Sequence, residues 1–239
     1  FPARVQQNIY RGMFRDEACR VIYNGIPLEK LDEYQATNSR EAARSELGYT
    51  PDDLLVLHLG TVCKRKGQNL TVRAFAGAVE NGDIPNGKLL MVGARYIRQH
   101  EIDFQKELKE FIASRGLEAR AKIMDIQKDV RPFLLAADIV VVPSLNEVLP
   151  LVLCEAGAFR RPVIASRIDG IPEAISDGVE GFLIERGNID ELQNRLVRLA
   201  KDPELRVAMG NAGRSRVERQ FSFATMTDAY INLIREAIT

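Results

Sequence analysis

The sequence predicts an α/β fold built around an open parallel sheet with helices on both faces. Short runs of branched aliphatic residues alternate with helix-length amphipathic segments from Leu54 almost to the end of the chain. This alternation is typical of parallel strands joined by crossover helices, and each crossover is expected to be right-handed. The aliphatic runs lack a two-residue polar period, which favours strands that are covered on both faces.

The individual elements follow in order from these patterns. The aliphatic runs predict strands at residues 21–23, 54–59, 89–92, 122–124, 139–142, 163–165 and 182–184. The amphipathic segments between them predict helices at about residues 68–79, 101–115, 131–136, 151–159 and 190–200. Further helices are expected at residues 203–209, 212–220 and 223–238. Residues 1–20 are interpreted as a linker helix and the polar residues 32–47 as a surface helix.

Length and charge favour one neutral domain over residues 1–239. The 239 residues are 46% hydrophobic and 28% charged, which is ordinary for a globular domain. The 33 Lys and Arg residues balance 33 Asp and Glu residues, so the formal net charge is zero and nothing predicts a nucleic-acid partner.

The cysteines and histidines do not predict a metal site. Cys19, Cys63 and Cys154 show no paired spacing, and the chain has only two histidines. A Cys/His zinc site is therefore not expected, and reduced thiols favour a cytoplasmic protein. His58 lies in an expected strand and is interpreted as a core or edge histidine rather than as a catalyst.

The sequence predicts neither a membrane span nor a signal peptide. The longest apolar stretch, residues 133–143, is interrupted by Asp138 and is about half as long as a membrane span. The first residue is Phe, and the opening segment has no apolar signal core, which predicts a fragment of a longer chain. We therefore expect the protein to be cytoplasmic, or peripheral to a membrane when it is full-length.

Several common nucleotide-binding motifs are absent. No Gly-x-Gly-x-x-Gly follows a strand, which disfavours NAD chemistry, and no Gly-x-x-x-x-Gly-Lys-Ser/Thr loop is present to indicate an NTPase. The sequence also lacks Asp-x-Asp, so the usual carboxylate clamp for a divalent metal on a nucleotide diphosphate is missing. We expect no metal and no cofactor, so protein charges would have to balance a bound diphosphate.

The loop after the 54–59 strand is rich in cations. It comprises residues 60–67, with the sequence GTVCKRKG, and leads into a helix. Ligands of open α/β sheets bind beyond the carboxyl ends of the strands. The free amides of a helix amino terminus, together with Lys66, would hold an anion there. Two interpretations remain open, an anion-binding loop and an ordinary solvated run of cations.

A second loop, residues 143–150, joins the 139–142 strand to an apolar helix. Pro150 is expected at the first helical position. Glu147 precedes the first turn, and Glu155 lies about 7 to 8 Å along the helix axis. The two carboxylates therefore flank a helix amino terminus at different depths.

These two carboxylates suit a ligand that carries hydroxyl groups on both sides of an anion. A vicinal diol offers two donors to the two oxygens of a carboxylate, and nucleoside diphosphate sugars have this layout. The alternatives are that Glu147 only complements the helix dipole and that Glu155 is a charge on a solvated face. Apolar residues surround Glu155, however, which predicts burial and hence the need for a partner.

Together these motifs resemble the retaining glycosyltransferases of family 4, which have the GT-B fold. The resemblance runs from about Val21 to the end of the chain and depends on the order and spacing of several motifs. They are Glu147 and Glu155 with seven residues between them, the loop ending in Lys66-Gly67, and segments 21–26, 137–139, 143–144, 162–165, 170–173 and 177–183.

This resemblance implies a Rossmann-like domain that forms the carboxyl-terminal, donor-binding half of a GT-B enzyme. The enzyme would move a sugar from a nucleotide diphosphate sugar to an acceptor with retention of configuration. By position, Glu155 would hold the ribose hydroxyls, while Glu147 and Lys66 would be catalytic, at the donor sugar and the diphosphate leaving group. The expected donor-binding residues are Gly60, Thr61, Lys66, Met124, Ile126, Glu147, Val148, Leu149, Leu151, Val152 and Glu155.

The sequence departs from the family pattern at two of these positions. Thr61 stands where most members have Arg after the glycine of the first loop, which removes one of two expected cations. Lys64 or Arg65 could substitute for this cation, but neither occupies the matching position. Val148 is bulkier than the small residue that often follows the first Glu.

The resemblance also implies an amino-terminal acceptor domain outside this chain. The isolated chain is therefore expected to bind a nucleotide sugar but to transfer little or no sugar. Residues 222–239 resemble the helix that crosses back to that domain, and an exposed apolar face there would favour a homodimer of the isolated chain. The acceptor, whether glycan, lipid or small molecule, is not specified. The alternatives are a non-catalytic nucleotide-binding or assembly module and a GT-B enzyme that resembles a sugar-nucleotide epimerase.

Overall fold

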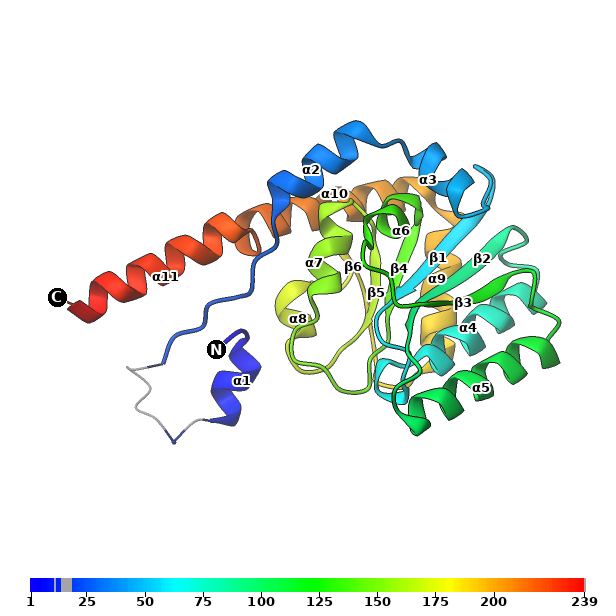
Figure 1. Cartoon of the computed structure of the whole chain (residues 1–239), viewed down its shortest axis with the longest axis horizontal. Helices are drawn as coiled ribbons and strands as arrows, with labels where there is room; N and C mark the ends of the chain where they lie inside the picture. The colour runs from blue at the N-terminus through cyan, green and yellow to red at the C-terminus, as the bar shows by residue number, and fades with distance from the viewer. Residues whose placement is uncertain (11, 14–18, 239) are drawn as a thin grey trace.

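The computed structural model describes residues 1–10, 12–13 and 19–238, and a six-stranded sheet forms its centre (Figure 1). The strands lie in the order β3-β2-β1-β4-β5-β6, and every neighbouring pair is parallel. They are β1 (Leu54–Leu59), β2 (Gly87–Ala94), β3 (Ala121–Asp125), β4 (Ile139–Val142), β5 (Val163–Ser166) and β6 (Gly181–Ile184). This arrangement confirms the expected open, Rossmann-like α/β sheet.

Helices cover both faces of the sheet, as the aliphatic strands predicted (Figure 1). One face packs against α4 (Gln68–Glu80), α5 (Gln99–Ser114) and α9 (Ile189–Lys201). The other packs against α2 (Leu28–Thr37), α3 (Arg40–Glu46), α6 (Arg131–Ala136) and α7 (Leu151–Ala158). Successive residues of β1 alternate between the two cores, with Leu55 and Leu57 in one and Val56 in the other.

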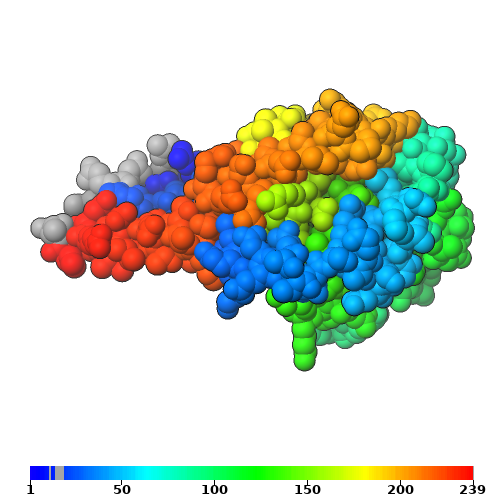
Figure 2. Space-filling model, turned by 90° about the horizontal axis from the view of Figure 1, so that it is seen from above, coloured from blue at the N-terminus to red at the C-terminus, as the bar shows by residue number. Residues whose placement is uncertain are grey.

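The remaining helices lie at the ends of the chain and beyond β5. They are α1 (Arg4–Ile9), α8 (Ile171–Ala174), α10 (Pro203–Gln220) and α11 (Phe223–Ile238), and a short 3-10 turn, η2, spans Lys64–Lys66. α11 extends away from the body of the molecule and has no fully buried residue (Figure 2). None of the described helices combines the length and apolar content needed to cross a bilayer.

The expected strands are confirmed from β1 to β6, but the strand expected at residues 21–23 is wrong. This segment is extended and gains its burial beside the sheet rather than within it. The Tyr23 hydroxyl donates to Glu173 Oε2 at 2.9 Å, and the Tyr23 ring lies 5.2 Å from that of Phe221. The contacts of Tyr23, and not a ladder of backbone hydrogen bonds, therefore hold this segment.

The helices between strands are also confirmed, whereas two expected helices differ. Residues 32–47 belong to two helices, because Ser39 has an extended backbone and its Oγ caps α3 by accepting from Ala42 N at 3.1 Å. Of the linker helix expected at residues 1–20, only Arg4–Ile9 is helical among the described residues, and residues 11 and 14–18 lie outside them.

α10 is one continuous helix where two were expected, at residues 203–209 and 212–220. Gly210 suggests a break in the sequence, because glycine is a poor helix former. In the structure a Cβ on Gly210 would lie 2.1 Å from the carbonyl oxygen of Arg160. The glycine therefore marks a close crossing of α10 over the end of α7, not the end of a helix.

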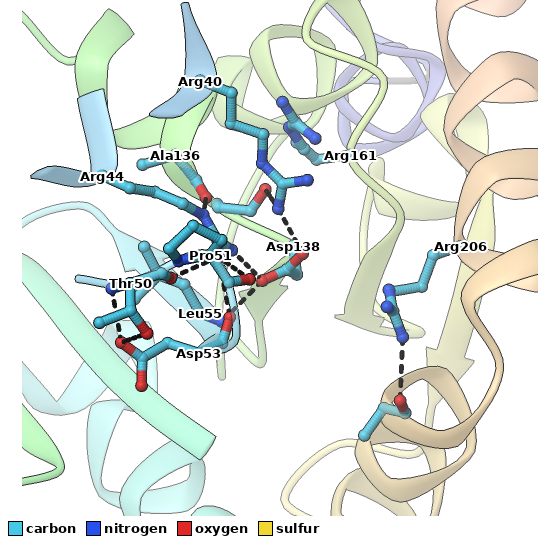
Figure 3. Close-up of polar contacts among 12 residues, drawn as sticks. Arg40, Arg44, Thr50, Pro51, Asp53, Leu55, Ala136, Asp138, Arg161 and Arg206 are labelled. Atoms are coloured by element: carbon cyan, nitrogen blue, oxygen red, sulfur yellow. Dashed lines mark hydrogen bonds and ion pairs between the residues drawn. The ribbon is translucent and has the colours of Figure 1, made fainter. Parts of the chain in front are cut away.

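A buried ionic network surrounds Asp138, at the amino-terminal end of the central strand β4 (Figure 3). Asp138 pairs with Arg40 and Arg44 and accepts a hydrogen bond from Leu55 N at 2.7 Å. The Arg44 side chain is only 4% exposed. Its guanidinium also donates to the backbone carbonyls of Thr50, Pro51, Asp53 and Ala136. The network thus ties α3 and the start of β1 to the start of β4.

Replacing Asp138 by alanine is expected to lower the free energy of unfolding by about 3 kcal/mol, because Arg44 stays buried without its charged partner. The matched control is Glu80→Ala, which removes an exposed ion pair with Arg115 and should cost about 1 kcal/mol or less. Urea unfolding followed by circular dichroism measures both values. Equal losses in the two variants would contradict the structural importance of the network.

His58 is a core residue, as expected. It is 2% exposed, and its Nδ1 lies 2.8 Å from Thr71 Oγ1. Burial, and to a lesser extent the charge of Lys66, lowers the pKa of the imidazole from 6.5 to about 3. The ring is therefore neutral in the folded protein at neutral pH.

His58 is expected to make the protein less stable in mild acid. The unfolded chain protonates this ring below pH 6.5, whereas the folded chain does so only near pH 3. The His58 contribution to unfolding free energy therefore falls by about 1.4 kcal/mol per pH unit within that range. Urea unfolding at about pH 7 and pH 5 should show a steeper loss for the native protein than for His58→Gln. Parallel losses would rule out this contribution.

Candidate functional site

The sheet order reverses between β1 and β4, and such a reversal leaves a crevice beyond the carboxyl ends of the strands. A cavity of about 500 Å³ lies there, within the range of small-molecule sites. It is lined by Leu59, Gly60, Thr61, Lys66, Val92, Gly93, Ile126, Gln127, Val130, Glu147, Leu149, Pro150, Leu151, Val152 and Glu155. The two loops selected from the sequence therefore meet at one cavity.

The loop after β1 is held against the end of β4 by close backbone contact. Gly67 follows η2 with a φ of 76°, in the left-handed region. A Cβ on Gly67 would lie 2.3 Å from the carbonyl oxygen of Pro143, so only glycine permits this approach. Leu145 N also donates to the carbonyl oxygen of Arg65 at 2.8 Å. The cation-rich loop is thus packed against the second loop and is not simply solvated.

Gln68, the first residue of α4, holds the same loop from inside. The residue is fully buried. Its Nε2 donates to the carbonyl oxygen of Thr61 at 3.0 Å, and its Oε1 accepts from Cys63 N at 3.3 Å. These bonds satisfy backbone groups of the turn. Sequence analysis missed Gln68, for which the only signal is a polar residue at the start of an apolar helix.

Asp169 and Gly170 support the loop after β4. Glu147 N donates to Asp169 Oδ2 at 3.0 Å, and Gly170 N donates to the carbonyl oxygen of Val148 at 2.8 Å. Asp169 has a φ of 47°, which is uncommon for a residue other than glycine. Asp169 was not predicted, and Gly170 was named only as part of the motif at residues 170–173, because both follow β5 and reach this loop only through the folded sheet.

Lys66 and Glu147, the two expected catalytic residues, form an ion pair in the cavity wall. Their side chains are 16% and 14% exposed. Arg65 Nη1 lies 3.2 Å from the same carboxylate oxygen, Oε2, and also donates to the carbonyl oxygen of Asn146 at 3.1 Å. The Glu147 carboxylate therefore forms ion pairs with two cations, Lys66 and Arg65.

Glu155 is a half-buried acid whose side chain lines the cavity. Burial raises the pKa of its carboxyl group. No hydrogen bond or ion pair reaches this carboxyl from any described residue. The partner that the sequence predicted for it is therefore not part of the described chain, and its place is open to a ligand.

The amino terminus of α7 also faces the cavity. Pro150, expected as the first helical residue, is instead the N-cap residue with an extended backbone, and α7 begins at Leu151. The helix is not buried all round as expected, because Leu151 is 40% exposed and Val152 is half-buried on the cavity side. No side chain caps the helix, so its first amides add a partial positive charge to the cavity.

Most of the expected donor-binding residues come together in the cavity lining. They are Gly60, Thr61, Lys66, Ile126, Glu147, Leu149, Leu151, Val152 and Glu155. Met124 packs against the core instead, and Val148 lies at the surface beside the cavity. Sequence analysis did not name Gly93, near the end of β2, or Gln127 and Val130, which follow β3, and all three also line the cavity.

Three charged side chains of the described residues line the cavity, Lys66, Glu147 and Glu155, and they do not form a metal site. Within the described part of the chain, no three His, Cys, Asp or Glu side chains are grouped to hold a metal ion. Of the described residues that line the cavity, Lys66 is the only cation, and Glu147 and Glu155 are the two acids. An anion could bind to the lysine and to the amino terminus of the helix in this cavity, and hydroxyl groups could bind to a carboxylate.

Comparison with known proteins agrees with this geometry. Residues 39–216 match the family described as "Glycosyl transferases group 1". The D-inositol 3-phosphate glycosyltransferase of Saccharomonospora viridis is 30% identical over 93% of this chain and 51% of its own length. The chain thus spans about half the length of the curated relatives that it matches.

Solved structures share the fold. Anabaena HepE, crystallised in complex with UDP, superposes with a TM-score of 0.89 at 25% identity, covering 98% of this chain and 62% of HepE. The C-terminal domain of the Francisella tularensis group 1 glycosyl transferase LpcC has a TM-score of 0.74 at 24% identity, covering 83% of this chain and 100% of that domain. The chain therefore belongs to the glycosyl transferases of group 1 and has the Rossmann-like fold of a GT-B glycosyltransferase domain.

Proposed function

We propose that this chain is the donor-binding half of a retaining family 4 glycosyltransferase and binds a nucleotide diphosphate sugar, with UDP as its nucleotide. The observation that carries the proposal is the single cavity in which Lys66, Glu147, the start of α7 and Glu155 meet. The crystal structure of HepE in complex with UDP supports the choice of nucleotide.

Each part of such a donor has a matching group in the cavity. Glu155 lies four residues after Leu151, about 6 Å along the helix from its first residue. A diphosphate at the uncapped amides of α7 therefore places the ribose diol near the Glu155 carboxylate, which lacks a partner among described residues. Ile126 and Gln127, which follow β3, are placed to contact the base.

Lys66 and Glu147 would act at the bond between the donor sugar and the diphosphate, which breaks during transfer. Negative charge develops on the diphosphate as it leaves, and Lys66 with the α7 amides would stabilise it. Glu147, beside Lys66, would accept hydrogen bonds from the donor sugar hydroxyls. In this proposal the chain's own charges stabilise the leaving group, and donor binding needs no metal.

Transfer would require a second domain that supplies the acceptor site. The apolar side chains of α11, which extends from the body (Figure 1), are proposed to pack against that domain in the full-length protein, and against a second copy in the isolated chain. The most exposed of them are Phe223, Tyr230, Ile234 and Ile238. The full-length enzyme is proposed to be cytoplasmic, or peripheral to a membrane where the acceptor is a lipid.

A non-catalytic nucleotide-binding module is the second candidate. The observation that favours it is Thr61, an uncharged residue that lines the cavity where the family pattern has a cation. Sugar transfer by the full-length protein separates the two candidates, since a binding module releases no sugar from the donor.

Isothermal titration of the chain with UDP, GDP and ADP is expected to show binding, with UDP the tightest. Uridine should bind more weakly than UDP, because it cannot use Lys66 and the α7 amides. Tightest binding of GDP or ADP would change the proposed base but not the donor-binding function. No binding of any of the three diphosphates would contradict the function itself.

Glu155→Ala is expected to weaken UDP binding by about 1.5 to 3 kcal/mol, because a charge-assisted hydrogen bond to the ribose is lost. The matched control is Glu110→Ala, which removes an exposed carboxylate of α5. Titration with 2′,3′-dideoxy-UDP provides a second check, since Glu155→Ala should not weaken the binding of a ligand without the diol. An unchanged affinity of Glu155→Ala for UDP would refute the ribose role.

A further inference from the structure

The charges that line the cavity do not by themselves balance a diphosphate. Among the described lining residues, Lys66 is the only cation, while Glu147 and Glu155 are acids and Thr61 is uncharged. Lys66 is already paired with Glu147. When Lys66 binds a phosphate, its positive charge no longer fully neutralises the Glu147 carboxylate. The carboxylate and the phosphate are both negative, and they repel each other strongly where water is excluded.

Arg65 supplies a second cation to Glu147 from outside the cavity lining. Its Nη1 lies 3.2 Å from Glu147 Oε2 and donates to the carbonyl oxygen of Asn146 at 3.1 Å. The carbonyl oxygen of Arg65 accepts from Leu145 N at 2.8 Å. Both the backbone and the side chain of Arg65 are therefore attached to the loop that carries Glu147, so Arg65 can stay in place when Lys66 moves.

The neighbouring cation has a different partner. Lys64 Nζ lies 3.6 Å from Glu107 Oε1 on α5, and the Lys64 side chain is 70% exposed. The run Lys64-Arg65-Lys66 thus divides its charges among three places: the outer face of α5, the Glu147 loop, and the cavity. Of the two cations that sequence analysis considered as replacements for a charge at position 61, neither lines the cavity, but Arg65 reaches the Glu147 loop.

We propose that Arg65 is a positioning residue of the donor site, which holds and neutralises the Glu147 carboxylate while Lys66 binds the phosphates of a nucleotide sugar. This inference rests on the proposed function. Arg65 does not line the cavity and acts on the ligand through Glu147. Its contribution should therefore require both a carboxylate at position 147 and a phosphate on the ligand.

A double-mutant cycle tests this requirement. The affinity for UDP is measured by titration calorimetry for the native chain, Arg65→Ala, Glu147→Gln and the double variant. Arg65→Ala is expected to weaken UDP binding about fivefold in the native background, the upper range for a partly exposed pair. In the Glu147→Gln background, the same change should weaken binding by less than about twofold, because no carboxylate remains to be held.

Three controls separate this role from a general loss of structure or charge. Lys64→Ala removes the adjacent cation and should change UDP affinity less than about twofold. Arg65→Lys, which keeps the charge, should restore most of the affinity lost in Arg65→Ala. Uridine leaves Lys66 free to remain on Glu147, so its binding, followed by chemical-shift changes in NMR spectra, should be equal in the native chain and Arg65→Ala.

The outcomes distinguish this inference from the proposed function. If the native chain binds UDP but Arg65→Ala binds it equally well, or loses affinity equally with and without the Glu147 carboxylate, the positioning role is wrong and the donor-binding function stands. Equal weakening of uridine and UDP by Arg65→Ala also overturns the role, since it indicates a disturbed loop. If the native chain binds no nucleoside diphosphate, both proposals fail together.

Discussion

The pairing of β1 with β4 is the constraint on which both the core and the site depend. The ladder between these strands is short, joining Val56 to Ile139 and Leu57 to Val140. At one end Asp138 ties the pair to α3, and at the other end Gly67 meets Pro143. Because crossovers run to opposite faces from these two strands, no helix fills the space beyond their carboxyl ends. Lys66 and Glu147, 81 residues apart in sequence, meet there.

The two ends of this strand pair use ion pairs in different ways. Around Asp138, backbone carbonyls satisfy most of the remaining donors of Arg44, so the charges are enclosed and fixed. At the cavity, Lys66 and Glu147 lie in a wall that a ligand can reach. A buried ion pair adds little net stability once desolvation is counted. The arrangement at the cavity is therefore better explained by binding, since its cation can exchange one anion for another.

Sequence patterns predicted the fold where a pattern has one structural explanation, and they failed where two different arrangements produce the same pattern. Aliphatic runs located every strand of the sheet, because strands covered on both faces must be apolar. The same pattern at residues 21–23 arose from Tyr23 packing on Phe221, which composition does not distinguish from sheet formation. Gly210 was equally ambiguous, since a helix break and a close crossing both require a residue without a side chain.

The candidate site shows the same division between local and tertiary information. The loops after β1 and β4 were predictable, because each follows the carboxyl end of a predicted strand and their charges are visible in the sequence. Asp169 was not, since it binds a backbone group 22 residues away that only the fold brings near. Gln68 was missed although its partners lie in the preceding loop, because a polar residue at the start of a helix does not by itself indicate which groups it binds. Glu155 is the informative case: its apolar neighbours predicted a buried acid in need of a partner, and the described chain gives it none. A half-buried carboxylate in a cavity wall, with no partner in the described chain, is available to a ligand, and paired hydroxyl groups match its two oxygens.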